Sequence, residues 1–130
     1  MNTGPIIVIE DDVDDQEIIT LVLESLHIPN KAVFFNDGLE ALNFLKSEDV
    51  HPFVILSDVN MPVMNGFEFL EAFRKVADEN NNSVIIILTT STNMRDFEQI
   101  KHFEEVEVYL SKPLTDENLQ YIIDKNFPQE

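Results

Sequence analysis

The chain has 130 residues, of which 44% are hydrophobic and 25% are charged, a balance typical of one compact globular domain. Its formal net charge of −17 disfavours direct binding to nucleic acid and to anionic membranes, because an acidic surface repels phosphate groups. The absence of cysteine excludes disulfides and thiolate metal sites and favours a cytoplasmic location, and no apolar stretch approaches the ~18–20 residues that span a bilayer.

Apolar runs alternate with amphipathic segments along the whole chain. In chain order, the pattern predicts a strand over 5–10, a helix over 13–27, a strand over 31–35, a helix from 38 to about 45, a strand over 53–57, a helix after 65, a strand over 84–88, a helix over 93–103, a strand over 106–111 and a helix over 116–126. Five such units with right-handed crossovers predict a parallel sheet covered on both faces. We expect a single domain over residues 1–130 with no output domain.

Several helix ends and helix faces are also predicted. Asp37 and Asn65 are expected to cap the helices that follow them, each with a glutamate three residues on. The first helix is expected to turn Ile18, Leu21, Val22 and Leu26 inward, and the fourth Met94, Phe97 and Ile100. The strand over 106–111 alternates apolar and polar residues, which favours a half-exposed sheet edge.

Polar residues close four of the apolar runs. They are Glu10-Asp11-Asp12 after the first strand, Asp58 after the third, Thr89-Thr90 at the end of the fourth and Lys112-Pro113 after the fifth. In an open parallel sheet, ligands bind outside the carboxyl ends of the strands. The sequence therefore predicts that an acidic cluster, a hydroxyl and a lysine converge on one rim.

Three carboxylates at one rim need a counter-charge. Two unit charges ~4 Å apart repel by ~4 kcal/mol at an effective dielectric of ~20. The carboxylates of Glu10, Asp11 and Asp58 offer hard oxygens without imidazole or sulfur, which suits Mg²⁺ or Mn²⁺, and the backbone carbonyl near Asn60 is a further expected ligand. Asp12 is expected to cap the first helix, yet as a third acid it leaves open which two bind the metal.

The charges then suggest a reaction. Three carboxylates, a divalent cation and Lys112 sum to zero, and a carboxylate can attack phosphorus to form an acyl phosphate. Asp58 is the predicted nucleophile because it stands alone on the central strand. Lys112 and the metal would cover the phosphoryl oxygens, and Thr89 could donate a hydrogen bond to one of them.

These residues carry a resemblance to the receiver (response-regulator) domains of two-component signalling. The matched pieces are Glu10-Asp11, Asp58-Val59-Asn60-Met61-Pro62 with Asn65-Gly66 downstream, Thr89, and Lys112-Pro113. The resemblance implies an α/β, flavodoxin-like (βα)₅ fold with a five-stranded sheet in the order 2-1-3-4-5. It implies Mg²⁺-dependent phosphorylation of Asp58 by a sensor histidine kinase or a histidine phosphotransfer protein. It also implies a switch made of Thr89 and Tyr109, a cis bond before Pro113 and a structural role for Gly66.

Several functions remain open at this stage. The phosphorylated chain would regulate a downstream protein target or pass the phosphoryl group on, and it would catalyse only its own phosphorylation and dephosphorylation. A receiver that serves as an unphosphorylated scaffold is one alternative. A metal-dependent aspartyl-phosphate phosphatase is less favoured, because Asn60 stands where its acid would be. Exposed residues of the first helix, among them Asp14, Asp15 and Glu17, are expected to help select the kinase.

Overall fold

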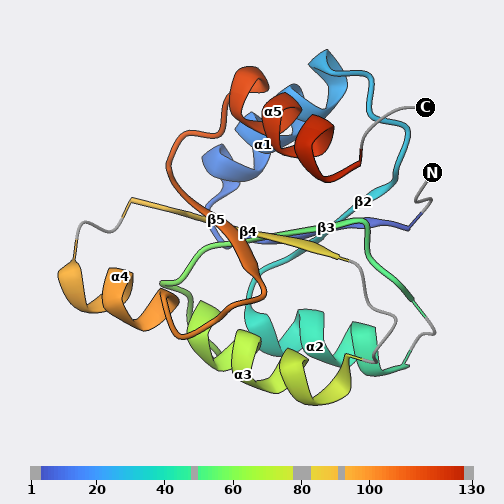
Figure 1. Cartoon of the computed structure of the whole chain (residues 1–130). Coiled ribbons are helices and arrows are strands. Elements are labelled where there is room, and N and C mark those ends of the chain that lie inside the picture. The colour runs from blue at the N-terminus through green and yellow to red at the C-terminus, as the bar shows by residue number, and fades with distance from the viewer. Residues whose placement is uncertain (1–3, 48–49, 78–82, 91–92, 128–130) are drawn as a thin grey trace.

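A computed structural model describes residues 4–47, 50–77, 83–90 and 93–127, where strands and helices alternate as predicted (Figure 1). The strands are β1 (Ile6–Ile9), β2 (Ala32–Phe35), β3 (Val54–Ser57), β4 (Val84–Thr89) and β5 (Val106–Ser111). The helices are α1 (Val13–Ser25), α2 (Gly38–Ser47), α3 (Gly66–Val76), α4 (Met94–Ile100) and α5 (Asp116–Asn126). In these described ranges, no helix has the length and apolar character needed to cross a membrane.

The five strands form one parallel sheet in the order β2-β1-β3-β4-β5, which confirms the predicted flavodoxin-like topology. Strand β3 is central, and β2 and β5 form the edges. Figure 1 shows α1 and α5 on one face of the sheet and α2, α3 and α4 on the other. All four polar segments predicted at strand ends therefore follow strands that point in the same direction.

Each face of the sheet has its own hydrophobic core, because successive side chains of a strand point to opposite faces. Val8 and Leu56 belong to the core beneath α1 and α5, with Ile19, Val22, Leu23, Leu119 and Ile122 from those helices. Ile9 and Ile55 belong to the core beneath α2 and α3, with Ala41, Leu42, Phe69, Leu70 and Phe73. Strands β1, β3 and β4 are buried along their whole length, which holds their carboxyl ends rigidly in place.

The helix caps largely follow the sequence. Asn65 and Glu68 form a complete capping box, in which each side chain accepts a hydrogen bond from the backbone N–H of the other. Asp37 accepts from the backbone N–H of Glu40 at 3.0 Å, as expected of the α2 cap. Helix α1 ends at Ser25, two residues before the predicted end, because His27 adopts a left-handed backbone with φ of 53°.

Two predicted helix faces are wrong in detail. On α1, Val22 is buried as predicted, but Leu21 is 57% exposed, and the other buried residues are Ile19 and Leu23. Helix α5 packs beside α1, and Leu21 lies on the side of α1 that stays exposed.

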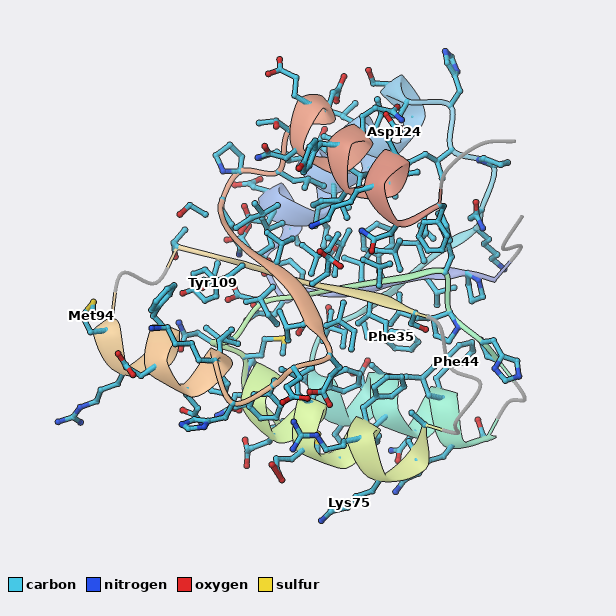
Figure 2. All side chains as sticks on the ribbon, viewed as in Figure 1. Phe35, Phe44, Lys75, Met94, Tyr109 and Asp124 are labelled. Carbon is cyan, nitrogen blue, oxygen red and sulfur yellow. The ribbon has the colours of Figure 1, made fainter. Side chains whose placement is uncertain are left out.

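On α4, only Ile100 is buried, whereas Met94 and Phe97 are 68% and 42% exposed. Figure 2 shows Met94 at the outer end of α4, directed away from the sheet. Helix α4 has only seven residues and lies beside the edge of the sheet, so it covers β5 incompletely. Phe97 packs edge-on against Tyr109 of β5, with ring centroids 5.8 Å apart.

Strand β5 is half exposed, as its alternating sequence predicts. Its pairing with β4 also changes register. Ile85 pairs with Val106 and Ile86 with Val108, so Glu107 is one extra residue in β5. This bulge lies at the start of the strand, and the pairing then continues regularly to Thr89 and Ser111 at the rim.

Candidate functional site

The backbone brings the candidate residues to one rim of the sheet. The N–H of Asp58 donates to the carbonyl of Ile9 at 3.1 Å, which fixes the end of β3 beside the end of β1. Glu10 directly follows β1. On the other side, the N–H of Lys112 donates to the carbonyl of Thr89 at 3.0 Å, which joins the ends of β5 and β4. The placement of these groups therefore depends on main-chain bonds of the sheet itself.

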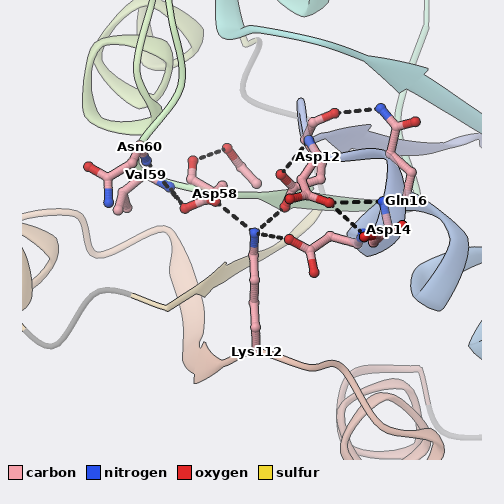
Figure 3. A network of polar contacts seen from close by, with 10 residues as sticks. Asp12, Asp14, Gln16, Asp58, Val59, Asn60 and Lys112 are labelled. Carbon is pink, nitrogen blue, oxygen red and sulfur yellow. Dashed lines mark hydrogen bonds and ion pairs between the residues drawn. The ribbon is translucent and has the colours of Figure 1, made fainter.

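Lys112 lies at the centre of the site (Figure 3). Its Nζ contacts Glu10 Oε1 at 2.5 Å, Asp15 Oδ2 at 2.7 Å and Asp58 Oδ2 at 2.8 Å. The lysine side chain is only 8% exposed, and those of Glu10 and Asp58 are similarly buried. One ammonium thus serves as the common counter-ion of three carboxylates.

Both carboxylate oxygens of Asp58 are hydrogen-bonded. Oδ1 accepts from the backbone N–H groups of Val59 at 2.6 Å and Asn60 at 3.2 Å, and Oδ2 faces Lys112. Charge-assisted hydrogen bonds of this kind fix the orientation of a carboxylate. The aspartate is therefore held between main-chain dipoles on one side and an ammonium on the other.

Burial shifts the pKa of Glu10 upward, because it penalises the charged carboxylate, and the Asp58 charge acts in the same direction. The hydrogen bonds from Lys112 and from the backbone of Asp12 offset part of this pKa shift. Burial also acts to lower the pKa of Lys112, yet its hydrogen bonds to Asp15, Asp58 and Glu10 outweigh it and hold the pKa above the ordinary value. The lysine is therefore a permanent cation at neutral pH.

The other acids of the β1–α1 segment differ in their surroundings. Asp12 caps α1, because its Oδ1 accepts from the backbone N–H groups of Asp14 at 2.8 Å and Asp15 at 3.2 Å. The side chain of Asp11 is exposed at the same end of the sheet and lies outside the Lys112 ion pairs of the described residues. The cap role predicted for Asp12 is confirmed.

Asp15 is a member of the site that the sequence did not indicate. We expected it on the exposed face of the first helix, but its carboxylate is only 25% exposed and pairs with Lys112. Helical side chains tilt toward the N-terminus of their helix, so a residue in the first turn of α1 points back toward the rim. That direction, together with the cap at Asp12, is the signal that could have identified it.

The remaining candidates surround this network. Thr89 is buried at the end of β4, and Tyr109 lies two residues before the end of β5, against Phe97. The Lys112–Pro113 peptide bond is cis, as the resemblance implied. Gly66 begins α3 so close to β3 that a Cβ would lie 2.4 Å from the carbonyl oxygen of Asp58.

A hard divalent cation fits the donors of this site in chemistry and charge. Glu10 and Asp58 supply buried carboxylate oxygens, and the position between them already accommodates the positive charge of Lys112. Within the described residues, no group of three acidic or histidine side chains is arranged to hold a metal ion. The ammonium of Lys112 occupies the point between Glu10, Asp15 and Asp58. Residues that would hold such an ion are Glu10, Asp11 and Asp58, with the main-chain carbonyl of Asn60.

The chain as a whole is similar to known proteins. The model of the response regulator receiver domain family matches residues 6–124. The response regulator Rcp1 of Synechocystis is 32% identical over 113 residues, which cover 82% of this chain and 75% of Rcp1. The sensor histidine kinase CheAY of Helicobacter pylori is 30% identical over 128 residues, and there the chain spans only 15% of the kinase.

One of the similar solved structures contains a metal ion. The receiver domain of the sensor histidine kinase PA1611 from Pseudomonas aeruginosa superposes with a TM-score of 0.77 and 26% identity, covering 95% of this chain and 97% of that one. That structure holds a magnesium ion coordinated in its active-site cleft.

Proposed function

The chain belongs to the response regulator receiver domain family of two-component signalling, and on that premise we propose that Asp58 is its phosphoacceptor. One observation carries the proposal. The Asp58 carboxylate lies at the end of the buried central strand, with Oδ1 on two backbone N–H groups and Oδ2 on the ammonium of Lys112. This arrangement positions a carboxylate and supplies positive charge where phosphoryl oxygens would gather.

The proposed reaction is the transfer of one phosphoryl group. A carboxylate oxygen of Asp58 attacks the phosphorus of a phosphohistidine, and a P–O bond forms while the P–N bond breaks. The electron pair of the broken bond returns to the imidazole, which leaves neutral because its other nitrogen carries a proton. With acetyl phosphate as donor, acetate leaves with the electron pair instead. Lys112 stabilises the charge that develops on the phosphoryl oxygens.

We assign the metal-binding role to Glu10, Asp11, Asp58 and the main-chain carbonyl of Asn60. When bound, Mg²⁺ (or Mn²⁺) would neutralise phosphoryl oxygens that the acidic rim otherwise repels. The need for such a cation follows from the charges, since Lys112 alone balances only one of its three carboxylate neighbours. The magnesium ion in the PA1611 receiver supports this assignment.

Receiver domains are partnered with histidine kinases in two-component systems. We propose that phosphorylation of Asp58 biases a two-state element made of Thr89 and Tyr109 at the β4–β5 edge. Thr89 ends the strand next to β3, and Tyr109 contacts Phe97 of α4, so the pair links the rim to the outer surface. A downstream protein or a histidine phosphotransfer protein would read that surface.

The test is the intact mass of the protein after incubation with acetyl phosphate and Mg²⁺. Wild type should gain the mass of one phosphoryl group, and Asp58→Asn should gain none. Asp14→Asn is a matched control, because it also removes one carboxylate near the rim but changes an exposed side chain. Metal-free wild type should remain unmodified.

Each outcome has a definite meaning. Modification that requires both Asp58 and the metal supports the phosphoacceptor function. Wild type that stays unmodified with acetyl phosphate and with phosphorylated kinases would instead favour a scaffold that has the fold without the chemistry. Modification that persists in Asp58→Asn would move the acceptor to another residue and overturn the proposal.

A further inference from the structure

The ammonium of Lys112 has no spare hydrogen-bond donor. A lysine ammonium carries three N–H groups, and the three carboxylates at 2.5–2.8 Å use all of them. If Lys112 is to contact a phosphoryl group on Asp58, it must release at least one present partner. The question is which carboxylate remains to hold it.

The three carboxylates that contact Lys112 have different roles in the proposed reaction. Asp58 becomes the acyl phosphate, and Glu10 is assigned to the divalent cation. Asp15 has neither task, and its backbone is fixed in the first turn of α1 by the cap at Asp12. Asp15 alone is therefore free to keep its contact with Lys112 throughout the reaction.

The two ends of this contact come from opposite ends of the chain. The backbone of Lys112 is tied to Thr89 by its N–H, while Asp15 is 97 residues earlier on a different element. Figure 3 shows the lysine side chain extending from the loop after β5 straight toward the carboxylates. Anchoring at both the main chain and the ammonium leaves the long lysine side chain little freedom.

We propose that Asp15 is a positioning residue that keeps the ammonium of Lys112 directed at Asp58 when Glu10 engages the divalent cation. The proposal rests on the proposed function of Asp58. In this proposal Asp15 contacts neither the phosphoryl group nor the metal, and acts only through Lys112.

Removing Asp15 has two physical consequences. The ammonium loses one of its three anchors, and it shifts toward Glu10 and Asp58, where it competes with the cation. A misplacement of about 1 Å in a reacting group costs on the order of 100-fold in rate, so Asp15→Asn should slow phosphorylation by about 10- to 100-fold. The competition should raise the Mg²⁺ concentration needed for half the maximal rate. The lower maximal rate should persist at saturating Mg²⁺, because it comes from the misplaced lysine.

The first experiment measures the phosphorylation rate with acetyl phosphate as a function of Mg²⁺ concentration, by intact mass. The proteins are wild type, Asp15→Asn, the conservative Asp15→Glu, and Asp14→Asn as control for the lost charge. Asp15→Asn should have a lower maximal rate, and Asp15→Glu should recover most of it. Asp14 is exposed and precedes Asp15 in the sequence. Asp14→Asn should therefore leave the maximal rate unchanged and alter at most the Mg²⁺ concentration needed for half of it.

The second experiment needs neither metal nor phosphoryl donor. In ¹H–¹⁵N spectra of lysine ammonium groups, an ammonium held by three carboxylates exchanges slowly with water and gives its own cross-peak, assigned with Lys112→Met. This cross-peak should disappear or shift in Asp15→Asn and remain in Asp14→Asn.

The two proposals fail in distinguishable ways. A wild-type protein that gains no phosphoryl group contradicts the function of Asp58. If wild type is phosphorylated and Asp15→Asn reaches the maximal rate of Asp14→Asn, only the role of Asp15 is overturned. An unchanged Lys112 cross-peak in Asp15→Asn would overturn that role as well.

Discussion

Replacing Lys112 by methionine removes the counter-ion of the site and keeps most of the side-chain volume. The oxygens of Asp15 and Asp58 both lie within 2.8 Å of the same nitrogen, so they are at most about 5.5 Å apart and repel by about 3 kcal/mol at an effective dielectric of ~20. Glu10 adds two further repulsive pairs. Water screens part of this energy at Asp15, which is a quarter exposed.

Loss of one partner of a buried ion pair destabilises a protein by about 3–5 kcal/mol, which agrees with this estimate. Domains of this size have free energies of unfolding of about 5–15 kcal/mol, so Lys112→Met should lose a large part of its stability in metal-free buffer. Mg²⁺ should restore more stability in the variant than in wild type, because no ammonium competes for the carboxylates. At 100 times its dissociation constant, a ligand stabilises the folded state by about 2.7 kcal/mol.

Urea unfolding with EDTA and with Mg²⁺ measures both effects. Lys75→Met is a suitable control, since Figure 2 shows Lys75 projecting into solvent from α3. A Lys112→Met protein as stable as Lys75→Met in EDTA would refute the reasoning, because it would mean that the three carboxylates do not need the ammonium. An equal gain from Mg²⁺ in the variant and in wild type would refute the competition between lysine and metal.

Three further expectations concern the surrounding structure. Gly66→Ala should lower the free energy of unfolding by about 1–3 kcal/mol in urea, because the new Cβ would lie 2.4 Å from the carbonyl of Asp58 and the backbone must move; an unchanged midpoint contradicts this. His27→Gly should raise the free energy of unfolding by about 1 kcal/mol, since φ of 53° disfavours a side chain; a lower midpoint would argue against it. Glu105→Gln should lower the melting temperature at pH 7, because the hydrogen bonds from Arg74 depress the pKa of Glu105 below its ordinary 4.5. That contribution exists above the unfolded-state pKa and is lost as the pH falls through the lower folded value, so a difference that does not shrink as the pH falls below 4.5 would exclude this origin.

The order and type of the elements could be predicted because local signals agree with the fold. Continuous apolar runs mark β3 and β4, and the alternation of residues 106–111 marks β5 as an edge. Capping residues give the starts of α2 and α3. The ends of the helices are harder to predict. The residue that stops α1 is His27, whose left-handed backbone conformation is not indicated by its residue type.

The orientation of the helices could not be predicted to the same extent. Periodicity gives the width of an apolar stripe, but the neighbouring elements decide which residues of it are buried. Leu21 and Met94 lie on apolar stripes and are nevertheless exposed, because α5 and the edge of the sheet leave those sides uncovered. For the same reason the sequence did not indicate the contact of Asp15 with Lys112, since the direction of the Asp15 side chain depends on where the first turn of α1 lies relative to the rim.

The bulge in β5 changes what this edge of the sheet offers to another strand. An edge strand offers unpaired backbone groups to any other strand, and a regular edge is a template for aggregation. Because Glu107 is inserted between the residues that pair with Ile85 and Ile86, the outer side of β5 lacks the even spacing that an incoming strand would need. Glu107 also brings a charge to that edge, paired with Lys125 of α5 at 3.3 Å. The irregularity that interrupts the β4–β5 ladder thus makes the start of β5 a poorer template for pairing with another strand.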